Sequence, residues 1–147
     1  MEMKVPTLKS KSKNFVMKKN VFLVLRLGVG MSMFGHGLVR LPKLGAFASW
    51  MSGSFQQTML LEPLVHFFGL LLPIMEFSLG LLLLIGLFTK QAASIAVLLM
   101  LILLFGTCML ENWEAIPSQL IHLLFLAVLL QFVDRNSFSL DNRISNL

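Results

Sequence analysis

Residues 64–88 read LVHFFGLLLPIMEFSLGLLLLIGLF, and this stretch decides the fold. A helix needs about 20 mainly apolar residues to cross a bilayer, so Leu64–Phe88 is long enough to do so. One carboxylate, Glu76, lies near its middle, where an acidic side chain costs roughly 2.5–3.5 kcal/mol to insert. Such a residue faces protein or water rather than lipid, which makes Glu76 the first candidate for a functional role.

The composition extends this interpretation to the whole chain. The 147 residues are 56% hydrophobic and 13% charged, with a mean hydropathy of +0.83, whereas a soluble domain is about a quarter charged. The sequence therefore predicts an all-α fold, an integral membrane four-helix bundle. We expect spans near residues 20–39, 64–88, 91–110 and 118–133, within one membrane domain over 20–133. Residues 134–147 would form a C-terminal tail.

Between the first two expected spans, Leu41–Leu61 is broken up by small and polar residues. Its aromatic side chains, among them Phe47 and Trp50, are typical of a membrane interface. The pattern predicts a short interfacial helix or re-entrant loop over one mouth of the bundle, with a plain surface loop as the alternative.

The net charge of +5 is placed asymmetrically. Six lysines precede the first span, in a basic tail over residues 1–19, whereas only Arg40 and Lys43 lie in the loop that follows it. The positive-inside rule then places both termini in the cytoplasm, in a bacterial inner (plasma) membrane. Binding of nucleic acid is not expected, because the basic run is short and lacks interleaved aromatic residues. A cleaved signal peptide is not expected either, since Arg26 interrupts the apolar run.

The second span carries the strongest signal of a site. At 100° per residue, one quadrant of the helix holds His66, Gly69, Pro73, Glu76 and Gly80. A polar, small and kinked stripe of this kind must face protein or water. The alternative is that Glu76 only fixes the bundle through hydrogen bonds.

Arg26, in the first span, is the first candidate for the charge partner of Glu76. Helical side chains lean toward the N-terminus of their own helix, so Arg26 would lean inward and Glu76 outward. A direct pair then needs an unfavourable lean or a bridging water. Otherwise Arg26 extends to the inner headgroups.

The three histidines, His36, His66 and His122, all lie toward the outer ends of their expected spans. Together they could bind a cofactor or relay protons, and His66 and His122 are the candidate cofactor ligands. No pair on a single helix has metal-ligand spacing, so no metal site is predicted. The single cysteine, Cys108, excludes an intramolecular disulfide and a CxxC pair.

Three motifs resemble the DoxX-like family of small membrane proteins. They are GHGLVRL at Gly35–Leu41, PIMEFSLGLLLLIGLFTK at Pro73–Lys90, and FSLD at Phe138–Asp141. The glycine-proline-glycine that often precedes the last motif in that family is replaced here by Asp134-Arg135-Asn136. The resemblance implies a four-helix bundle, with functional positions at Arg26, His36, Gly37, Glu76 and Asp141.

The family name connects it to membrane subunits of thiosulfate–quinone oxidoreductase. The leading expectation is a subunit linked to quinone or sulfur redox chemistry, in which Glu76 handles protons and Arg26 and His36 support it. Quinone is then the candidate cofactor, and a redox protein or a second copy of the chain the candidate partner. The alternatives are a non-enzymatic scaffold for a partner enzyme and a small proton-coupled carrier.

Overall fold

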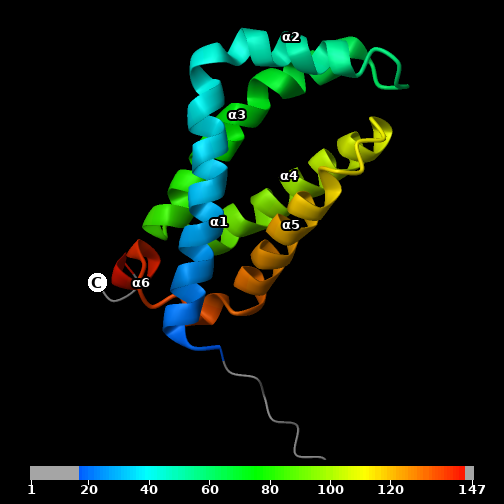
Figure 1. Ribbon diagram of the computed structural model, residues 1–147. Coiled ribbons are helices and arrows are strands. Elements are labelled where there is room, and N and C mark those ends of the chain that lie inside the picture. The colour runs from blue at the N-terminus through cyan, green and yellow to red at the C-terminus, as the bar shows by residue number, and fades with distance from the viewer. Residues whose placement is uncertain (1–16, 145–147) are drawn as a thin grey trace, which may run out of the picture.

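The computed structural model describes residues 17–144, and all its regular elements are helices (Figure 1). Four long helices are α1 (Lys19–Arg40), α3 (Glu62–Ile85), α4 (Thr89–Met109) and α5 (Ile116–Gln131). The shorter elements are η1 (Leu41–Lys43), α2 (Leu44–Ser54), η2 (Val133–Arg135) and α6 (Leu140–Ile144). By length and composition, the run Lys19–Ser54, α3 and α4 can each cross a membrane, and α5 is a shorter apolar helix. The predicted fold class, a membrane helical bundle with a short helix after the first span, is confirmed.

The helix ends follow local sequence rules. Proline stands in the first turn of both α3 and α5, where its missing N–H costs no helical hydrogen bond. α3 ends at Gly86, whose φ of 69° is a left-handed conformation that glycine adopts readily. Pro73 lies inside α3, one turn before Glu76.

Glycines bring α1 and α3 into close contact. A Cβ on Gly37 would overlap the backbone of Phe77, and a Cβ on Gly80 would overlap the backbone of Phe34. The rings of Phe34 and Phe77 then pack beside each other, with centroids 4.9 Å apart. In lipid, where helix association depends on close packing, such contacts hold two helices together.

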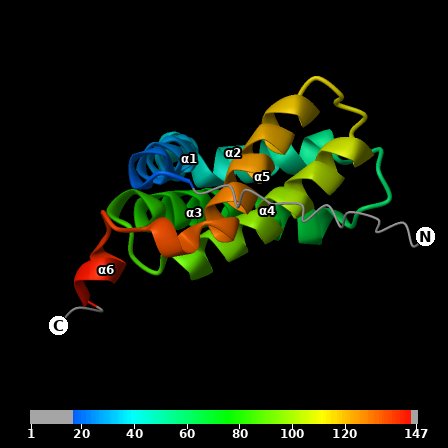
Figure 2. The ribbon, with the colours of Figure 1, turned by 90° about the horizontal axis from the view of Figure 1, so that it is seen from below.

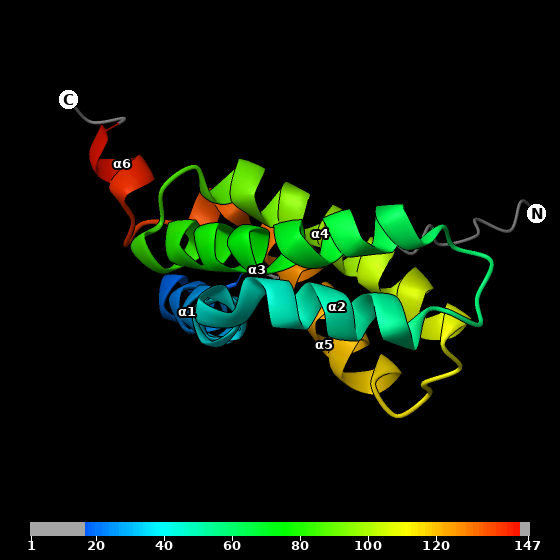
Figure 3. The same cartoon turned by 90° about the horizontal axis from the view of Figure 1, so that it is seen from above.

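α2 lies across the end of this pair where α1 ends and α3 begins, and it packs on the first half of α3 (Figure 3). The contact is close because α3 has Gly69 here, and a Cβ on it would lie 2.9 Å from the Cα of Ala48. α2 is therefore a packed helix rather than a plain surface loop, and it forms a short layer over the bundle.

α4 and α5 form a second antiparallel pair, which leans away from α1 and α3 (Figures 1 and 2). The two pairs are close at the end that carries α6 and diverge toward the end that carries α2. The molecule is thus V-shaped, with α2 extending over the open end of the V.

Candidate functional site

Glu76 forms a salt bridge with Arg40. The Arg40 Nη1 lies 2.6 Å from the Glu76 Oε2, and the two side chains are 28% and 6% exposed, respectively. The guanidinium also stacks over the ring of Phe47, with its central carbon 4.8 Å from the ring centroid. Arg40 therefore joins the end of α1 to both α3 and α2, and it compensates a carboxylate that would otherwise be buried alone.

Arg26, the first candidate for the charge partner of Glu76, is not its partner. Arg26 is 2% exposed at the opposite end of the molecule, and its Nη2 donates a 2.7 Å hydrogen bond to the carbonyl oxygen of Phe138. It packs so closely against Gly86 that any side chain at that position would overlap the guanidinium. Side chains on α1 lean toward its N-terminus, which takes Arg26 away from Glu76 and toward Gly86.

The same lean brings Arg40 to Glu76. Arg40 is the last residue of α1 and leans back toward the start of α1, whereas Glu76 on the antiparallel α3 leans toward the start of α3. The expected first span ends near residue 39, so the pattern places Arg40 in the loop and does not suggest it as the partner of Glu76. The signal that could have found it is its position four residues after His36, which places both on one face of α1.

The C-terminal segment lies against the start of α4. The carboxylate of Asp141 accepts hydrogen bonds from the backbone N–H groups of Phe88 and Thr89, at 2.6 and 2.8 Å. The amide of Asn136 donates to the Thr89 hydroxyl at 2.8 Å. Asp141 thus acts as a cap on α4 supplied from a distant part of the sequence.

A cavity of about 630 Å³ occupies the open part of the V. Its lining is mainly apolar, but it includes His36, Arg40, Glu76 and His122 among its polar groups. The expected site residues Glu76, His36 and His122 therefore share one cavity. Arg26 and His66 do not line it.

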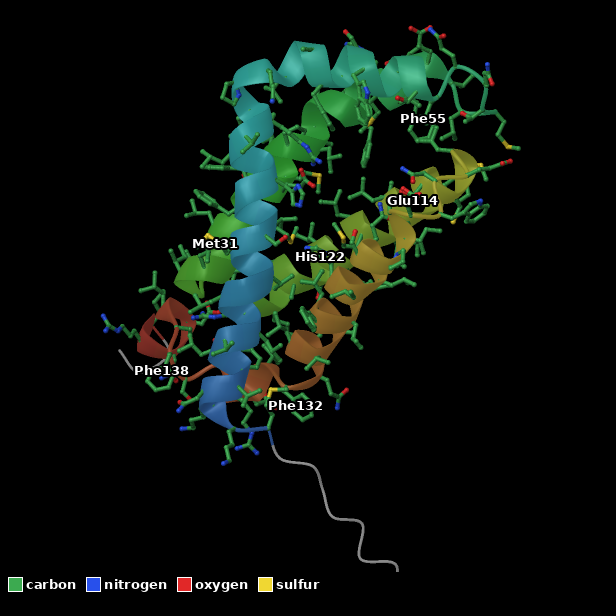
Figure 4. The ribbon with its side chains drawn as sticks, in the orientation of Figure 1. Met31, Phe55, Glu114, His122, Phe132 and Phe138 are labelled. Carbon is green, nitrogen blue, oxygen red and sulfur yellow. The ribbon has the colours of Figure 1, made fainter. Side chains whose placement is uncertain are left out.

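The histidines have separate surroundings. His122 lies 2.8 Å from both the Ser32 hydroxyl on α1 and the carbonyl oxygen of Ser118 (Figure 4). A carbonyl only accepts, so the proton is assigned to Nδ1, and Nε2 accepts from Ser32 when the ring is neutral. His66 lies 3.4 Å from the Ser52 hydroxyl on α2. Within residues 17–144, no three His, Cys, Asp or Glu side chains gather closely enough to hold a metal ion.

Gln119 is a further polar residue of the cavity wall that the sequence analysis did not single out. Its Nε2 donates to the Thr107 hydroxyl at 2.7 Å, which links α5 to α4. With Ser32 and His122 linking α1 to α5, polar contacts thus join the helices around the cavity.

The cavity combines a large apolar volume with a few convergent polar groups, as sites for small organic molecules do. Comparison with curated proteins and with solved structures finds no match. Comparison with models of protein families finds one, described as DoxX, over residues 21–108.

Proposed function

The chain belongs to the DoxX family, and from this premise we propose that it is the integral membrane subunit of a quinone- or sulfur-linked redox system. Its cavity would bind the ring of a quinone or quinol, with Glu76 and Arg40 as the polar partners of the ring oxygens. The observation that carries this proposal is the Arg40–Glu76 pair in the wall of an apolar cavity of about 630 Å³.

The residues present fit such a ligand. Small-molecule pockets usually have volumes of roughly 300–1,000 Å³ and fix their ligands with a few placed polar groups. A quinol hydroxyl could donate to the Glu76 carboxylate, and a quinone oxygen could accept from Arg40 or His36. When bound, the quinone would supply two-electron chemistry. The chain would supply binding, orientation and a group that exchanges protons.

Electrons would have to pass between this ligand and a partner. The sequence contains one cysteine, and therefore no dithiol of its own. A redox protein that docks on the membrane subunit is the partner we propose. The orientation we propose for docking places both termini in the cytoplasm, with Lys18, Lys90 and Arg135 at the same inner end.

The test is a visible spectrum and an organic extraction of the protein purified in mild detergent. We expect a quinone in stoichiometric amount in the wild type and a clear loss in Glu76→Gln, which keeps the shape of the side chain but cannot titrate. Glu114→Gln is the matched control, because Glu114 is an exposed carboxylate outside the cavity lining (Figure 4). A quinone-free wild-type protein, or equal quinone in all three proteins, would contradict the proposal.

A further inference from the structure

The cavity has two chemically different sides. Its polar groups come chiefly from α1 and α5, which contribute His36, Arg40, Ser118, Gln119 and His122. The side between α3 and α4 has fewer polar groups, Glu76 and Thr107, and is otherwise apolar. There, Leu64, Ile102 and Phe105 line the cavity and are also 58%, 45% and 54% exposed at the surface.

This apolar side opens within the membrane. α3 and α4 are both long and apolar enough to span the bilayer, and they are joined at their inner ends by the short connection around Gly86. Leu64 lies near the outer start of α3 and Phe105 near the outer end of α4, where the two helices have diverged (Figure 1). An opening between two membrane-spanning helices faces lipid tails, not water.

Phe55 forms the outer edge of this opening. It follows α2 directly, and its ring lies 3.3 Å from where a Cβ on Gly106 of α4 would be (Figure 4). Gly106 therefore leaves room for the ring, which reaches from the end of α2 to α4. The short helix after the first span thus roofs the cavity and leaves its α3–α4 side as the apolar exit.

We infer that the cavity takes an amphiphile with one polar ring and one long apolar chain, which enters from the bilayer between α3 and α4. The polar ring of the ligand lies against Arg40 and Glu76. Its long apolar tail extends past Leu64, Ile102 and Phe105 toward the lipid. This inference rests on the proposed function and narrows its ligand to a chain-bearing quinol or quinone of the membrane.

Photocrosslinking in lipid nanodiscs tests the route. One probe is a benzoquinone with a ten-carbon chain and a diazirine at the far end of that chain. The second is the same ring without the chain, with the diazirine on the ring. Excess decyl-benzoquinone serves as the competitor. Nonspecific labelling of lipid-facing positions persists in its presence and is subtracted from the total labelling.

We expect competitor-sensitive labelling by the chain probe at Leu64, Ile102 and Phe105, and by the ring probe near Arg40. Chain labelling on the α1–α5 side, at His36 or Ser118, would overturn the lateral route while leaving quinone binding intact. Absence of competitor-sensitive labelling by either probe would overturn the proposed function, and with it this inference.

A pair of glycine variants makes the test specific. Gly106→Leu places a side chain in the opening, and we expect chain-probe labelling to fall at least about tenfold, equivalent to withdrawing roughly two methylenes from apolar contacts. Ring-probe labelling should stay within about twofold, as for a harmless surface change. Gly28→Leu is the control, because Gly28 has open space around it. Leu64→Trp repeats the obstruction from α3 if Gly106→Leu does not fold, and unchanged chain-probe labelling in a folded obstructed variant would overturn the route.

Discussion

Two arginines of α1 show how strongly position along a helix decides the role of a charged residue. Arg26 and Arg40 lie fourteen residues apart on the same helix, yet one binds a backbone carbonyl near α6 and the other a carboxylate in the cavity. Both side chains lean toward the N-terminus of α1. For Arg26 this direction leads away from Glu76, and for Arg40 it leads toward it.

The Arg40–Glu76 pair should behave as a unit. Replacing Arg40 by Leu leaves the carboxylate buried without a partner, and we expect a loss of about 2–4 kcal/mol in the free energy of unfolding. Because the double variant Arg40→Leu/Glu76→Leu removes both charges, it should recover most of this loss. Thermal unfolding of the wild type, Arg40→Leu, Glu76→Leu and the double variant in one detergent measures the coupling, and strictly additive losses would argue against the pair.

At the scale of elements, the contact between α1 and α3 depends on glycine. We expect Gly37→Ala to cost about 2 kcal/mol or more, because the new methyl group overlaps the backbone of Phe77 and forces the helices apart. Gly28→Ala, nine residues earlier on the same helix, adds a methyl group in open space and should be neutral or stabilising by about 0.5–1 kcal/mol. Melting curves of the two variants give the comparison, and equal shifts would contradict it.

The cap that Asp141 provides is a property of two elements distant in the sequence. Asp141→Ala removes the acceptor for the N–H groups of Phe88 and Thr89, and we expect a loss of about 1–2 kcal/mol. Hydrogen exchange should rise in the first turn of α4. The control is Asp134→Ala, which removes an exposed carboxylate of η2. Unchanged exchange at Phe88 and Thr89 would show that α4 does not need the cap.

The elements were more predictable than the contacts between them. Long apolar runs such as Leu64–Phe88, with Gly86 near its end, indicate helices from local sequence alone. The partner of Glu76 depends on the relative rotation and depth of α1 and α3, which the sequence pattern does not specify. The role of Asp141 depends on a chain reversal after α5, and a polar tail gives no local sign of it.

For the whole molecule, the placement of basic residues predicts one orientation in the membrane. In a Cys108→Ser background, a membrane-impermeant maleimide applied to intact cells should label Glu114→Cys in the outer loop. Lys90→Cys, at the start of α4, should react only after permeabilisation, because the inner end carries the excess of basic residues. Labelling of Lys90→Cys in intact cells would indicate the opposite topology, and a redox partner would then dock on the other side of the membrane.

The length of α5 has a consequence for the lipid around the protein. Its 16 residues rise about 24 Å, whereas the hydrocarbon core of a typical bilayer is about 30 Å thick. Local thinning of the bilayer is one response to such a mismatch, and it compresses the acyl chains beside α5. The protein should therefore melt at a higher temperature in short-chain lipids than in long-chain lipids, and in a cell it should gather where the membrane is thin.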